Sequence, residues 1–84
     1  MRISVLTYPE AGISRPCAFH LGGRRVPVAS IVSRWEDETG RYFEVRDLDG
    51  RRFLLRQCLD TALWELAGVC GRSSPARAFA ASSL

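Results

Sequence analysis

Lysine is absent from this sequence. All 12 basic residues are arginine, and with nine acidic residues they give a formal net charge of +3 at pH 7. Arginine forms planar, bidentate hydrogen bonds to phosphate and carboxylate groups, so the bias is compatible with a nucleic-acid partner. However, +3 is small beside the basic patches of dedicated nucleic-acid-binding proteins, and a GC-rich genome would also favour arginine. Composition alone leaves both interpretations open.

Long apolar runs and paired cysteines are also lacking. No apolar run approaches the ~20 residues of a membrane-spanning helix, and the apolar stretch at residues 3–6 is too short for a signal-peptide core. The three cysteines, Cys17, Cys58 and Cys70, are odd in number and irregularly spaced. This argues against a disulfide framework and fits a reducing compartment. We therefore expect a cytoplasmic protein with no membrane partner.

Motifs for catalysis and cofactor binding are missing as well. The sequence has no phosphate-binding glycine loop, nucleotide-binding fingerprint or Ser-His-Asp order. Cys17 and His20 have the spacing of a zinc-ligand pair, but the other two cysteines lie too far apart to form the second pair. The acidic residues 36–38 cluster at a turn with no second acidic group to complete a site. We expect no enzyme activity, no metal and no cofactor.

Turn signals recur at short, regular intervals, at residues 22–23, 36–40, 48–50 and 59–62. The segments between them are rich in β-branched and aromatic residues, a pattern typical of all-β barrels and sandwiches. We predict an all-β fold, either a small five-stranded SH3-like barrel or a strongly bent antiparallel meander. The expected strands are residues 17–21, 24–35, 41–47, 51–57 and 63–69.

The length of 84 residues supports one domain. Residues 1–15 are expected to form an N-terminal strand or lead-in segment, 16–70 the barrel, and 71–84 a disordered tail rich in serine and alanine. One alternative remains within the barrel. Leu55, Leu59, Ala62 and Leu66 recur at helical spacing, so a helix competes there with the favoured strand–turn–strand.

Two hairpins can be aligned by their apolar residues. A two-residue loop at 22–23 places Phe19 opposite Val26 and Cys17 opposite Val28. A three-residue loop at 48–50, with Gly50 in the left-handed region, keeps the second hairpin's apolar residues on one face. The pairs there are Val45 with Phe53 and Phe43 with Leu55.

This register places Tyr42, Glu44, Arg46, Arg52, Leu54 and Arg56 on the outer face. Arg46 lies opposite Arg52, and like charges at such a position repel each other. A bound anion, Glu44 or Asp47 would relieve that repulsion.

The long segment 24–35 cannot keep one face turned inward. A bend near Ala29 and Ser30 would turn Val26, Val28, Ile31 and Trp35 toward the core. Pro27 has no amide donor, which favours an edge position. We predict that Trp35 and Trp64 are core anchors.

Residues 16–69 resemble a small bacterial domain family. The similarity lies in "PCAFHLGGRRVPVASIVSRW", "RYFEVRDLDGRRFLLR" and "LDTALWEL", although the family is more polar and contains glycine where this chain has "CLDTAL". Members of the family occur alone or at the C-terminal end of ImuB-type proteins, the inactive relatives of Y-family DNA polymerases. The resemblance implies a small β-barrel linked to DNA repair, and it implies no catalytic residues.

We therefore expect a small accessory binding module that contacts the DNA or RNA backbone non-specifically. Tyr42 is the candidate for base stacking, because the register places it outside among arginines. The alternatives are a protein–protein adapter, a self-associating homodimer, or an outer face that is merely solvated. The candidate nucleic-acid-binding residues are Arg46, Arg52, Arg56, Tyr42, Arg24 and Arg25.

Overall fold

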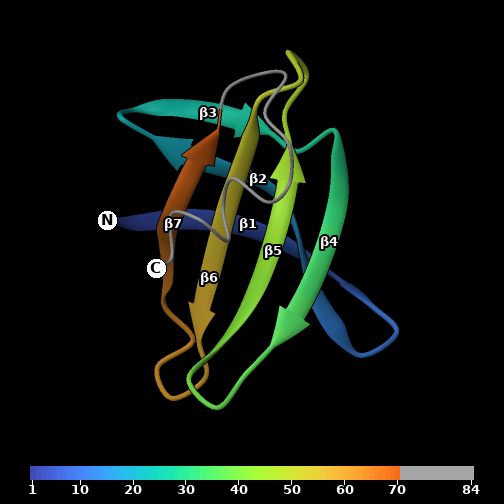
Figure 1. Ribbon diagram of the computed structural model, residues 1–84, viewed down its shortest axis with the longest axis vertical. Coiled ribbons are helices and arrows are strands. Elements are labelled where there is room, and N and C mark those ends of the chain that lie inside the picture. The colour runs from blue at the N-terminus through green and yellow to red at the C-terminus, as the bar shows by residue number, and fades with distance from the viewer. Residues whose placement is uncertain (71–84) are drawn as a thin grey trace.

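The computed structural model describes residues 1–70, all within one antiparallel sheet and its turns (Figure 1). The strands are β1 (Arg2–Glu10), β2 (Ile13–Leu21), β3 (Arg24–Pro27), β4 (Ser30–Glu36), β5 (Gly40–Arg46), β6 (Arg52–Cys58) and β7 (Trp64–Cys70). Their order in the sheet is β3-β2-β1-β7-β6-β5-β4. The predicted all-β class is confirmed. The predicted count of five strands is wrong, because β1 joins the sheet and segment 24–35 divides into β3 and β4. The predicted disordered tail lies outside the described residues.

The sheet curls into a half-barrel, so that the chain link between β3 and β4, the first and last strands of the sheet order, joins its two ends (Figure 1). The amide of Val28 donates to the carbonyl of Cys17 on β2 at 2.9 Å, and the next amide, Ala29, donates to Arg46 on β5 at 2.8 Å. Successive residues thus bond to strands near opposite ends of the sheet order. The expected bend near Ala29 is confirmed, as is the edge position of Pro27 on β3.

Both predicted hairpin registers are confirmed. Phe19 pairs with Val26 across the β2–β3 turn, and Val45 pairs with Phe53 across the β5–β6 turn. Gly50 has a φ of 84°, the left-handed conformation that the three-residue loop requires. The favoured strand–turn–strand is also confirmed, since β6 and β7 pair as antiparallel neighbours. The helical alternative for this segment is therefore wrong.

The core lies between the curled halves of the sheet. Phe19, Phe43, Val45 and Leu55 are fully buried, and the Phe19 and Phe53 rings meet edge to face with centroids 5.1 Å apart. None of the described residues belongs to a helix that could cross a membrane.

The two tryptophans differ in their surroundings. Trp64 is buried against Phe43, as predicted. Trp35 is 44% exposed, so its prediction as a core anchor is wrong. A second irregularity between Ile31 and Ser33 is the reason: Ile31 pairs with Val45 of the inner face, but Trp35 pairs with Tyr42 of the outer face.

Candidate nucleic-acid interface

The outer face of β4, β5 and β6 brings together four of the six predicted binding residues. Arg46 lies opposite Arg52 at one end of the β5–β6 pair, and Tyr42 lies opposite Arg56 toward the other end. Glu44 and Leu54 form the pair between them. The confirmed register therefore places these four predicted residues on one surface.

Glu44 occupies the centre of this surface and is only 4% exposed. Its carboxylate accepts hydrogen bonds from Arg52 Nη1 and from Ser33 Oγ, each at 3.1 Å. Burial of a carboxylate is costly unless it is paired and hydrogen-bonded in this way. Arg52, whose side chain is 17% exposed, thus neutralises Glu44. Of the predicted routes that relieve repulsion between Arg46 and Arg52, the structure shows the one through Glu44.

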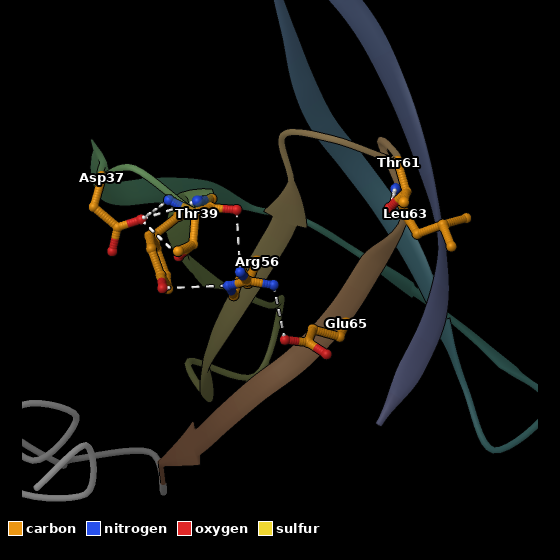
Figure 2. A network of polar contacts seen from close by, with 8 residues as sticks. Asp37, Thr39, Arg56, Thr61, Leu63 and Glu65 are labelled. Atoms are coloured by element: carbon orange, nitrogen blue, oxygen red, sulfur yellow. Dashed lines mark hydrogen bonds and ion pairs between the residues drawn. The ribbon is translucent and has the colours of Figure 1, made fainter.

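Arg56 is held by three neighbours at once, two of which Figure 2 labels. Its Nε donates to the Tyr42 hydroxyl at 3.3 Å, Nη1 donates to Glu65 at 3.1 Å, and Nη2 donates to the carbonyl of Thr39 at 3.1 Å. The hydrogen bond to Tyr42, together with the nearby charge of Glu65, raises the pKa of Arg56 above its usual value. Each nitrogen donates to a protein group, and three of the five N–H donors are used, so Arg56 chiefly braces the surface.

Gly40 allows Arg56 to take this position. A Cβ atom at Gly40 would lie 2.9 Å from Arg56 Nε and 3.1 Å from the carbonyl of Gln57. The turn before Gly40 is fixed by Asp37, whose Oδ1 accepts from the Thr39 amide, the Thr39 hydroxyl and the Gly40 amide, each at 2.9 Å (Figure 2). These bonds, the Thr39 amide first, lower the pKa of Asp37. Asp37 therefore fixes the turn that places Gly40 against Arg56.

Trp35 also belongs to this surface, although the sequence analysis predicted it to lie in the core. Its indole stacks on the Tyr42 ring with centroids 5.3 Å apart and planes 7° from parallel. Arg56 lies 5.9 Å from the Tyr42 centroid, within the range of cation–π attraction. The Tyr42 ring is thus held in place by Arg56, and the Trp35 indole remains exposed. The signal in the sequence was that segment 24–35 cannot keep one face turned inward. The prediction explained this with one bend near Ala29, whereas the strand has a further irregularity between Ile31 and Ser33.

The remaining predicted residues have different surroundings. Arg46 is half-buried and forms no ion pair within residues 1–70. Arg24 and Arg25 are exposed on β3, at the other end of the strand order from β4. Arg24 lines a pocket of about 200 Å³ with Arg51 and Asp47, away from the aromatic stack. The structure therefore does not join Arg24 and Arg25 to the outer face of β4–β6.

Within the part of the chain that the structure describes, no three histidine, cysteine or acidic residues form a cluster that could hold a metal ion. Glu36 of the acidic turn pairs instead with Arg41 at 3.1 Å. No family model, curated protein or solved structure matches this chain.

Proposed function

We propose that this chain is a non-enzymatic accessory module that binds single-stranded nucleic acid. A base would stack on the Trp35–Tyr42 pair, and the backbone would contact Arg46. The observation that carries the proposal is the exposed indole, 44% accessible and stacked on a tyrosine that Arg56 holds in place. An aromatic platform is sequence-tolerant because every base has a π-face.

The charge of the surface sets the expected mode of binding. Three arginines, Arg46, Arg52 and Arg56, share the face with Glu44 and Glu65, which leaves about one unpaired positive charge. Phosphate contacts should therefore be few, and the affinity should fall less with salt than for proteins that make 6–10 such contacts. Stacking, worth about 1–3 kcal/mol per base, then supplies most of the affinity. A duplex keeps its bases stacked internally, so single strands should bind better.

The resemblance to domains of ImuB-type proteins is compatible with this proposal and would place the module beside DNA repair or mutagenesis proteins. Cys17 and Cys58 are free thiols, which agrees with a reducing cytoplasm.

A protein–protein adapter is the second candidate, and β4 is the observation that favours it. This strand is an edge of the sheet, and Val32 and Trp35 on it are exposed. An unpaired edge can accept a strand from a partner or from a second copy of the chain. Such pairing depends mainly on backbone bonds and apolar contact, so it would be nearly indifferent to salt.

Fluorescence anisotropy with a labelled single strand and its duplex, at two salt concentrations, tests the proposal. Trp35→Ala should weaken binding by about 1–3 kcal/mol, whereas Val32→Ala on the same strand should leave it unchanged. Arg46→Glu should weaken binding and reduce its salt dependence. Arg52 is left intact, because its removal would leave Glu44 buried without its cation. No binding of either nucleic acid at low salt would refute the proposal and favour the adapter.

A further inference from the structure

Residues on five neighbouring strands form one row across the outer face of the sheet. The pairing register links, in order, Trp35 on β4, Tyr42 on β5, Arg56 on β6, Glu65 on β7 and Arg2 on β1. Adjacent strands lie about 4.8 Å apart, so the row extends about 19 Å along the sheet from the aromatic stack to Arg2. The stack is therefore one end of a longer surface.

Arg2, at the other end of the row, points outward because its neighbour in β1 is turned inward. Ile3 packs against the core and pairs with the buried Trp64. Successive side chains of a strand alternate between its two faces, so Arg2 and Glu65 both lie on the outer face. Arg2 is exposed and forms no ion pair within residues 1–70. Its guanidinium is therefore available to a ligand.

A pocket of about 230 Å³ lies at this end of the row, and Arg2, Arg56 and Glu65 are among the residues that line it. The Glu65 carboxylate accepts a hydrogen bond from Arg56 Nη1 at 3.1 Å (Figure 2). That ion pair leaves the charge of Arg2 uncompensated, and Arg56 retains two unused N–H donors. Trp64 also lines the pocket but is buried, so a base has no ring to stack on. The pocket suits a phosphate group, which guanidinium groups bind well.

We propose that a bound single strand crosses the sheet along this row, with one base on the Trp35–Tyr42 stack and a backbone phosphate in the pocket between Arg2 and Arg56. This crossing path rests on the proposed function, and it adds a second phosphate contact to the one at Arg46. One strand of B-DNA rises about 3.4 Å per nucleotide, so eight nucleotides cover more than the length of the row even when they are not extended.

The other two arginine-lined pockets do not continue the row. In the pocket beside Trp35, Arg34 pairs with the fully buried Phe43, so its position in the register faces the inner side of the sheet. The pocket at Arg24 lies beside Phe53, another residue of the core. Neither pocket places an arginine on the outer face in line with the stack.

Fluorescence anisotropy with a labelled oligothymidylate of eight nucleotides, over a range of salt concentrations, tests the crossing path. Arg2→Gln should weaken binding about two- to fivefold, the scale of one exposed ion pair. It should also reduce the slope of log affinity against log salt concentration by about 0.7, the value for one phosphate contact of a single strand. Arg34→Gln removes another exposed arginine, next to Trp35 in the sequence but on the other face of β4, and should change neither quantity.

Cys58 provides a second measurement, because it lines the same pocket. A phosphate there would cover the thiol, and its negative charge would disfavour the reactive thiolate. A saturating concentration of the strand should slow the alkylation of Cys58, followed by peptide mass spectrometry, severalfold in the parent and in Arg34→Gln. The effect should be much smaller in Arg2→Gln. Cys17 on β2, outside the row, is the internal control and should react at an unchanged rate.

The outcomes separate the crossing path from the proposed function. If Arg2→Gln bound the strand with the affinity and salt dependence of the parent, the path would be overturned while the proposed function stood. Saturating binding that leaves the alkylation rate of Cys58 unchanged would overturn the path as well. Failure of the parent to bind the strand at low salt would refute both.

Discussion

Replacement of Arg52 by methionine separates a structural arginine from a ligand-binding one. Arg52 Nη1 lies 3.1 Å from Glu44 Oε2, and the two side chains are 17% and 5% exposed. Methionine keeps much of the length and apolar stem of arginine but removes the charge. The substitution therefore leaves Glu44 buried with Ser33 as its remaining side-chain hydrogen-bond donor.

The expected cost follows from that burial. Removing one partner of a buried ion pair destabilises a protein by about 3–5 kcal/mol, because the other charge is left uncompensated. We expect about 3 kcal/mol, the lower end of that range, since Arg52 retains some solvent access and Ser33 still donates to Glu44. For a domain of this size, each kcal/mol lowers the melting temperature by about 4–8 °C. The variant should therefore melt at least about 12 °C below the parent.

Urea unfolding followed by tryptophan fluorescence measures the loss, because Trp64 is buried in the core. Arg25→Met, at an exposed position on β3, is the matched control and should stay within about 0.5 kcal/mol of the parent. Adding Glu44→Gln to Arg52→Met should recover most of the stability, because no buried charge is then left unpaired. If Arg52→Met cost no more than Arg25→Met, the assignment of Arg52 as the structural partner of Glu44 would be refuted.

Three further substitutions test other parts of the structure. Gly40→Ala should destabilise the fold by about 1–3 kcal/mol, because the new methyl group would press on Arg56 Nε; a urea midpoint equal to that of the parent would contradict this contact. Leu55→Ala should cost about 2–5 kcal/mol in the same assay, because Leu55 is fully buried; a loss below 1 kcal/mol (roughly the scale of a surface change) would argue against its place in the core. Hydrogen bonds from Thr61, the hydroxyl first, lower the pKa of Cys58, and the thiolate is the form that reacts. Thr61→Val should therefore raise the pH at which alkylation of Cys58, followed by peptide mass spectrometry, reaches half its maximal rate; an unchanged pH profile would exclude this effect.

The hairpin registers could be predicted because only one alignment keeps apolar residues together. At the β5–β6 hairpin, a two-residue loop would have placed Arg46 opposite Phe53, whereas the three-residue loop pairs Val45 with Phe53, as observed. A shift by one residue turns every side chain of a strand to the other face. The local sequence therefore contains enough information to fix such a pair.

The position of Trp35 could not be predicted in the same way. The positions of the apolar residues show that segment 24–35 must change which face it turns inward, but they do not show how many times it does so. One bend near Ala29 explains Val28 and Ile31, and the second irregularity, between Ile31 and Ser33, depends on how β4 pairs with β5. That pairing places Trp35 over Tyr42, a contact between residues of different strands.

The arginines of the β5–β6 hairpin show why composition was a weak guide to the binding site. Their number and common face were visible in the sequence, but two of the three partners of Arg56 come from outside the hairpin: Glu65 on β7 and Thr39 in the β4–β5 turn. An arginine with three fixed partners loses little freedom on binding and keeps the Tyr42 ring in place. Arg56 then contributes to ligand binding by keeping the aromatic stack rigid. Under the proposed function, Arg52 and Arg56 of this hairpin support the binding surface, Arg46 contacts the nucleic-acid backbone, and the exposed indole of Trp35 at the sheet edge makes the stacking contact.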